Sequence, residues 1–130
     1  MRALLDTHVF LWLHTARRRL ARSVLDRLAD PATEVFISAA TAWEIAIKHE
    51  LGRLPLPEPA ASYVPSRLAA MDGRELPISH ADALAAGALP RLHRDPFDRL
   101  LVAQARRHDL VLVTADPAIG QYPVELLAAT

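Results

Sequence analysis

The hydrophobic residues of the chain alternate between short continuous runs and stretches with helical spacing. Residues 110–113 are all apolar, which is typical of a buried strand in a parallel sheet. Residues 34–37 are rich in β-branched and aromatic side chains and predict a second strand. Residues 96–108 carry apolar side chains at helical spacing and predict the clearest helix. In full, the pattern predicts strands at 2–6, 34–37, 76–78, 110–113 and 124–127, and helices at 7–14, 20–29, 39–51, 59–71, 80–87 and 96–108.

This alternation of strands and helices predicts an α/β fold with a central parallel sheet of four or five short strands, covered by helices on both faces. The absence of an internal repeat or a low-complexity linker favours one domain over residues 1–130. In such sheets, ligands bind beyond the carboxyl ends of the strands. The residues that follow each strand are therefore the first candidates for a functional site.

Composition narrows the possible chemistry. With 130 residues and a 52% hydrophobic share, the chain is long enough for one core without cross-links. It has no cysteine, which excludes disulfides, thiolate zinc sites and cysteine nucleophiles and fits a reducing cytoplasm. No apolar stretch reaches the length of a membrane span, so no membrane is expected. The formal net charge is zero, and charge alone therefore gives no support for a nucleic-acid partner.

Acidic residues follow several of the predicted strands. Asp6 ends the first strand, Asp116 follows the strand at 110–113, and Glu44 lies early in the helix after the second strand. Asp95 and Asp98 lie at the start of the helix at 96–108. Such a cluster of carboxylates suits a hard divalent cation, Mg²⁺ or Mn²⁺. Two such ions can activate water and stabilise the leaving oxygen of a phosphodiester.

Each acid also has a structural explanation. Asp6, Asp95 and Asp116 can each cap the helix that follows, and Asp95 and Asp116 both precede a proline. Glu44 can form an ion pair with Lys48 one turn later. Taken singly, these explanations are at least as good as the functional ones. The joint placement of the acids at strand ends favours a metal site.

Histidine and arginine provide further candidates. No HExxH pattern indicates a zinc site. His93 lies close to the acidic helix start, and we expect it to cap a helix end rather than to contact phosphate. Arg94, Arg99 and the basic stretch at 17–22 are candidates for RNA contacts, although residues 17–19 more simply form a solvated surface.

Four segments resemble the motifs of PIN domains, in the order and spacing of that family. They are LLDTH at 4–8, SAATAWEI at 38–45, HRDPFDRLLVAQA at 93–105 and VTAD at 113–116. The third is long and specific, and together the four extend over nearly the whole chain. Their form is most similar to the VapC-type toxins of bacterial toxin–antitoxin pairs. The resemblance implies a three-layer α/β/α PIN-like domain.

The resemblance also implies an activity, partners and residue roles. It implies a Mg²⁺- or Mn²⁺-dependent endoribonuclease that hydrolyses RNA with water activated at the metal. The enzyme would be a cytoplasmic homodimer held inactive by a cognate antitoxin. The residues that match are the acidic triad Asp6, Glu44 and Asp98, the fourth acid Asp116, the additional acid Asp95 as a metal ligand, and the hydroxyls Thr7 and Thr114, which would orient a carboxylate or a water near the substrate.

Other classes of protein remain open from the sequence. One alternative is a catalytically silent PIN-like module that binds RNA or a protein. A receiver-like phosphoacceptor domain is a weaker one, because it needs an acidic pair after the first strand and a lysine after a late strand. Here Thr7 follows Asp6, and Lys48 lies on an early helix. An acid-cluster phosphatase would need a second acid just after Asp6, where the chain has none.

Overall fold

The computed structural model describes all 130 residues and is built on one five-stranded sheet, in which every neighbouring pair is parallel. The order of the strands is β3-β2-β1-β4-β5, with β1 in the centre. Their bounds are β1 Arg2–Leu5, β2 Glu34–Ser38, β3 Arg74–Leu76, β4 Val111–Thr114 and β5 Leu126–Ala128. The predicted α/β class and parallel sheet are confirmed.

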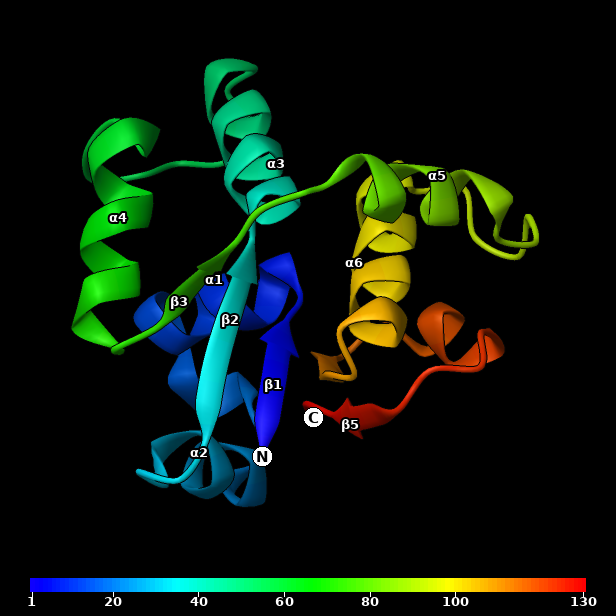
Figure 1. Cartoon of the computed structure of the whole chain (residues 1–130). Coiled ribbons are helices and arrows are strands. Elements are labelled where there is room, and N and C mark those ends of the chain that lie inside the picture. Colours follow the sequence, from blue (N-terminus) through cyan, green and yellow to red (C-terminus); the bar gives the residue numbers. More distant parts are fainter.

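Helices connect the strands and cover both faces of the sheet (Figure 1). Figure 1 shows α3 extending beyond the carboxyl end of β2, whereas α2 lies near the N-terminus, at the opposite ends of the strands. None of the helices is both long and apolar enough to span a membrane. The helices are α1 Thr7–Thr15, α2 Arg22–Ala29, α3 Ala39–Glu50, α4 Ala60–Ala70, α5 His80–Ala88 and α6 Pro96–Arg107, with short 3₁₀ turns η1 Arg17–Arg19 and η2 Pro117–Gln121.

The side chains of the central strands alternate between two hydrophobic cores. In β1, Ala3 and Leu5 belong to the core shared with α1, α2 and α4, whereas Leu4 belongs to the core shared with α5 and α6. In β4, Val113 and Leu112 divide in the same way. This alternation follows from the two-residue period of a strand. The sheet therefore lies between two layers of helices.

A chain of buried polar groups ties the layer of α5 and α6 to the end of β2. Gln104 is fully buried in α6, and its side-chain oxygen accepts a hydrogen bond from Ser38 Oγ at 2.5 Å. Its amide nitrogen donates to the Pro77 carbonyl at 3.1 Å and to the Asp82 carboxylate at 3.2 Å. Ser38 also caps α3 by accepting from the Ala40 amide at 3.0 Å. These bonds fix α6 relative to the start of α3.

The structure places some boundaries differently from the sequence prediction. β3 covers residues 74–76 instead of 76–78, because its first two residues, Arg74 and Glu75, are exposed and leave no hydrophobic signal. The predicted helix at 20–29 begins only at Arg22. The predicted caps Ser38 and Ser79 are confirmed. Leu51 is the C-cap residue of α3, and Gly52 follows with a φ of 72°, a conformation that glycine adopts readily.

Candidate active site

Asp6 lies at the carboxyl end of β1 and begins α1. Its Oδ1 accepts a hydrogen bond from the Val9 amide at 2.8 Å, which is the bond of a helix N-cap. Its Oδ2 accepts a hydrogen bond from the hydroxyl of Thr114, at the end of the neighbouring β4. The side chain is only 4% exposed, and burial raises its pKa above the usual range. The capping role predicted for Asp6 is thus confirmed, and its second oxygen lies at the sheet edge.

Glu44 lies in the second turn of α3 and is 3% exposed. Thr7 donates a hydrogen bond to its Oε1 at 2.6 Å, and Thr7 Oγ1 lies 3.1 Å from Thr41 Oγ1. Lys48 forms an ion pair with its Oε2 at 2.5 Å. The predicted pair with Lys48 is confirmed, but the glutamate is buried rather than exposed. The hydroxyl of Thr7, one residue after Asp6, holds this carboxylate toward α1.

Asp98 and Asp116 approach each other through His93. His93 Nε2 lies 3.0 Å from Asp98 Oδ2 and 3.1 Å from Asp116 Oδ2. The three ligating atoms lie within 4.8 Å of one another, close enough to hold one metal ion. His93 therefore lies between two carboxylates rather than capping a helix end, as the sequence suggested. Its sequence signal was its place five residues before Asp98, in the most specific of the four motifs.

The loop that carries His93 is held in place by Tyr122, which the sequence analysis did not single out. The Tyr122 hydroxyl accepts a hydrogen bond from the His93 amide at 3.0 Å and donates to the Pro90 carbonyl at 2.8 Å. The ring is buried in the core beside α6. No motif in the sequence marked the Tyr122 hydroxyl for this contact.

Asp95 caps α6, as predicted. Its Oδ1 accepts hydrogen bonds from the Phe97 amide at 2.9 Å and from the Asp98 amide at 3.4 Å. Asp116 likewise caps η2 by accepting from the Ala118 amide at 2.9 Å. These caps fix the starts of α6 and η2, which carry Asp98 and Asp116. A metal-binding role for Asp95 stays a prediction.

The electrostatics of Asp98 link the acids into one cluster. Burial, followed by the negative charges of Asp95, Asp6 and Glu44, raises the pKa of Asp98 to about 7. Only His93 acts in the opposite direction. Nearby like charges disfavour the ionised form of a carboxyl group, and a bound cation favours it. The site therefore carries more negative charge than its own basic groups compensate, and all-oxygen ligands of this kind fit a hard divalent cation.

The predicted substrate contacts have different surroundings. The guanidinium of Arg99 donates to the carbonyls of Ala86 and Leu89, both at 3.0 Å, and so holds the end of α5. Arg94 lies in the loop before α6 and forms no ion pair. The hydroxyls of Thr7 and Thr114 both donate to carboxylates of the cluster. RNA contacts by these residues stay predictions.

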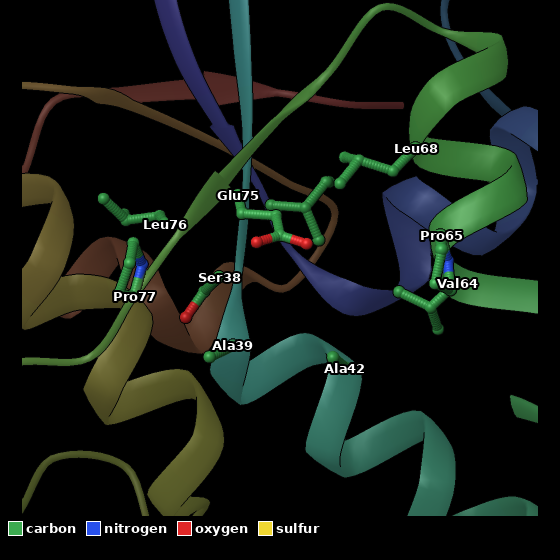
Figure 2. A pocket seen from close by; sticks show the side chains of 10 residues that line it. Ser38, Ala39, Ala42, Val64, Pro65, Leu68, Glu75, Leu76 and Pro77 are labelled. Atoms are coloured by element: carbon green, nitrogen blue, oxygen red, sulfur yellow. The ribbon is translucent and has the colours of Figure 1, made fainter. Parts of the chain in front are cut away.

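A separate pocket of about 250 Å³ lies between β2, β3, α3 and α4, away from the acids (Figure 2). Figure 2 shows the carboxylate of Glu75 directed into this space, with Ala42 of α3 and Val64 of α4 around it. Its lining is mostly apolar and includes none of the predicted site residues. The acidic cluster is therefore separate from this pocket.

Comparison with known proteins gives concordant matches. Residues 3–125 match the family model described as PIN domain. Ribonuclease VapC16 of Mycobacterium tuberculosis is 50% identical over 52 residues, which are 40% of this chain and 37% of that protein. Ribonuclease VapC22 of the same organism is 33% identical over 114 residues, which are 87% of this chain and 85% of the relative. The chain thus spans less than half of the first relative and most of the second.

Solved structures show the same fold. The complex VapBC2 from Rickettsia felis, bound to a DNA fragment from its promoter, contains a chain with a TM-score of 0.76 and 18% identity, with full coverage of both chains. A toxin–antitoxin complex from Klebsiella pneumoniae gives a TM-score of 0.67 and 23% identity, covering 97% of this chain and 96% of that one. At these identities the likeness concerns the fold.

Proposed function

This chain belongs to the PIN-domain family, and we propose that it is a metal-dependent endoribonuclease, the toxin of a toxin–antitoxin pair. The observation that carries the proposal is the cluster of acids at the carboxyl ends of the strands, in which Asp6 and Glu44 are buried and Asp98 and Asp116 are half-buried. Asp6, Glu44, Asp98 and Asp116 come from four segments far apart in the chain. The raised pKa of Asp98, to about 7, reflects burial and the negative charge around it. A site of this kind favours a bound cation.

These four carboxylates, with Asp95 as a further candidate, would hold Mg²⁺ or Mn²⁺. When bound, the cation would polarise water for attack on a phosphodiester and neutralise the charge that develops on the leaving oxygen. The remaining tasks belong to the protein. Thr114 and Thr7 orient the carboxylates of Asp6 and Glu44 through their hydroxyls. Groups that orient metal ligands in this way commonly matter almost as much as the ligands.

Hydrolysis by water at this site would leave a 5′-phosphate and a 3′-hydroxyl. Because water is the proposed nucleophile, the reaction does not need the 2′-hydroxyl of the RNA. RNA is favoured as substrate because VapC16 and VapC22 are both named as ribonucleases. RNA as substrate would also locate the reaction in the cytoplasm.

The proposed partner is a small cognate antitoxin. The complexes from R. felis and K. pneumoniae contain a chain with this fold together with an antitoxin. We further propose a homodimer, which the resemblance to VapC-type toxins implies. Co-expression with the neighbouring gene product and measurement of the molar mass of the purified complex would test both proposals.

The decisive experiment compares cleavage of total RNA and purified tRNA by the wild-type protein and Asp98→Asn, with Mg²⁺, Mn²⁺ or EDTA. Removing a group that only orients a metal ligand typically costs about 10–100-fold, so loss of the ligand itself is expected to reduce cleavage more than about 100-fold. Asp72→Asn is the matched control, because Asp72 is exposed and its positive φ suits asparagine. It should cleave like the wild type.

Three results would contradict the proposal. Fragments ending in a 2′,3′-cyclic phosphate would show attack by the RNA sugar instead of water. A folded, antitoxin-free protein that cleaves no RNA with either metal would favour a catalytically silent module that binds RNA or a protein. Cleavage that persists in EDTA would remove the metal from the mechanism.

A further inference from the structure

A groove of about 380 Å³ adjoins the acidic cluster on the side of α1. It lies between α1, the η1 turn and the end of α3 with the loop after it. A volume of this size is within the range of sites for small ligands. The side chains that give the groove its chemistry are Thr7, His8, Trp12, Arg19, Lys48 and Arg53.

The groove is basic, although the chain as a whole carries no net charge. Four of its lining residues have basic side chains, and none of its lining residues is acidic. His8, Arg19 and Arg53 form no ion pair with any carboxylate, unlike Arg22, Arg67, Arg74 and Arg107 elsewhere on the surface. Unpaired cations gathered in a groove attract an anionic chain.

An aromatic ring lies among these cations. The guanidinium of Arg19 stacks on the Trp12 ring at 4.1 Å from its centroid, and the His8 ring lies 5.9 Å from the same indole. Arg19 is exposed, so the outer face of its guanidinium is open to water. Proteins that bind single-stranded RNA commonly stack its bases on aromatic rings or on arginine planes.

The groove is continuous with the acidic cluster. Thr7 and Lys48 both line it, and both contact the Glu44 carboxylate, Thr7 at 2.6 Å and Lys48 at 2.5 Å. His8 follows Thr7 directly, at the start of α1. A polymer whose reacting phosphate lies at the acids could therefore continue into the groove.

We propose that this groove binds single-stranded RNA beside the cleaved bond, with phosphates on Arg19 and Arg53 and one base at the Arg19–Trp12 stack. The proposal rests on the proposed nuclease activity and specifies the form of its substrate. Paired RNA is disfavoured because its bases are stacked inside the helix and cannot reach the indole. An acidic peptide without aromatic side chains would satisfy the cations, but it has no flat ring to place at the stack.

The test measures binding of a labelled, mixed-sequence single-stranded oligoribonucleotide by fluorescence anisotropy in EDTA, where no cleavage is expected. For Arg19→Ala/Arg53→Ala, the Kd should rise about tenfold near physiological salt. The slope of log Kd against log salt should fall by about 1.4, because each phosphate contact to a single strand contributes about 0.7. Arg19→Lys/Arg53→Lys keeps both charges and should retain most of the slope.

Arg27→Ala/Arg106→Ala is the matched control, because it removes the same charge from exposed residues of α2 and α6 outside the groove. It should bind RNA with the wild-type salt slope. Wild-type affinity and slope in Arg19→Ala/Arg53→Ala would overturn the proposal. So would a polyglutamate peptide that binds as tightly as the RNA and loses the same affinity in this variant.

A second measurement reads the base stack directly. The chain has two tryptophans, so Trp43→Phe leaves Trp12 as the only one. Binding of the single-stranded oligonucleotide should quench the fluorescence of Trp12, whereas the duplex of the same sequence should not quench it. Unchanged emission at saturation would overturn the base contact at Trp12.

Cleavage of RNA with Mg²⁺ is measured in parallel to separate the two proposals. If the wild type cleaves no RNA yet binds it through the groove, only the nuclease activity is contradicted. If the wild type cleaves RNA and the arginine double variant binds like the wild type, only the groove is contradicted.

Discussion

Asp82 and Asp98 are two aspartates of the same α5–α6 region, and their carboxylates have opposite surroundings. Asp82 is fully buried, yet hydrogen bonds from the Ser79 amide, Gln104, Arg107 and His108 outweigh the effect of burial and lower its pKa to about 2. For Asp98, burial and the neighbouring acids raise the pKa to about 7. The same side chain is thus stabilised as an anion at one position and destabilised at the other.

This difference separates a structural carboxylate from a functional one. Around Asp82, donors complete the hydrogen bonding of both oxygens, and the Arg107 guanidinium contacts Oδ1. Around Asp98, His93 is the only basic partner. A buried acid whose partners are complete stabilises a fold, whereas one whose partners are incomplete has capacity for a ligand. Burial alone does not distinguish them.

The largest expected effect is an opposite change in stability from the same substitution at the two positions. Asp82→Asn should lower the free energy of unfolding by about 1–3 kcal/mol, because the NH₂ group that replaces one oxygen cannot accept from the donors that face it. This range allows for Arg107 and His108, whose side chains are 38% and 35% exposed and can be hydrated. Asp98→Asn should leave stability equal or higher, since it removes a disfavoured charge.

Urea unfolding in EDTA at about pH 8 measures both variants against the wild type, with the m-value as a check on the unfolded state. Destabilisation by Asp98→Asn equal to that by Asp82→Asn would contradict the comparison. The activity readout runs the other way, because Asp98→Asn should lose cleavage whereas folded Asp82→Asn should retain it.

The next effect is the pH dependence of stability without metal. The pKa of Asp98 in the folded protein is about 7, above its usual value of 3.8, so folding takes up a proton between these values. The free energy of unfolding should therefore rise by about 1–2 kcal/mol as the pH falls from about 8 to about 5. The contribution of Asp82, whose pKa is lowered to about 2, is present above pH 4 and is lost as the pH falls toward 2.

In Asp98→Asn, most of the rise in the free energy of unfolding toward pH 5 should be absent, whereas its decrease below pH 4 should remain. Thermal or urea unfolding across this pH range provides the measurement. Equal rises in the variant and the wild type would assign the effect to other groups.

The sequence predicts the sheet and the acids because both follow from periodic or local signals. The apolar runs of β1, β2 and β4 and the helical spacing of α6 are strong patterns, and the acids follow strand ends. The predicted position of the edge strand β3 is shifted, because its first residues, Arg74 and Glu75, are exposed and give no hydrophobic signal. Local pattern is a weak guide where a strand has only one neighbour.

The site was less predictable where a contact joins distant parts of the chain. His93 lies between Asp98 and Asp116, and its loop is fixed by Tyr122, a contact across 29 positions of sequence. The completed surroundings of Asp82 likewise come from residues 22–26 positions away. Nothing in the spacing of these residues distinguishes Asp82 from Asp98. Their difference arises only from packing.

The smallest expected effect concerns Thr114, which gives Asp6 a hydrogen-bond donor of the kind that surrounds Asp82. Its hydroxyl donates to Asp6 Oδ2 and accepts from the Asp116 amide at 3.0 Å, so it orients two acids of the cluster. Thr114→Val keeps the shape but removes both bonds, and it should weaken Mn²⁺ binding by about tenfold, the lower end for a group that orients a metal ligand. Thr114→Ser restores the hydroxyl and should recover most of the affinity. Calorimetric titration with Mn²⁺ measures all three proteins, and equal affinity in Thr114→Val and the wild type would mean that packing at the end of β4 holds Asp6 without the hydroxyl.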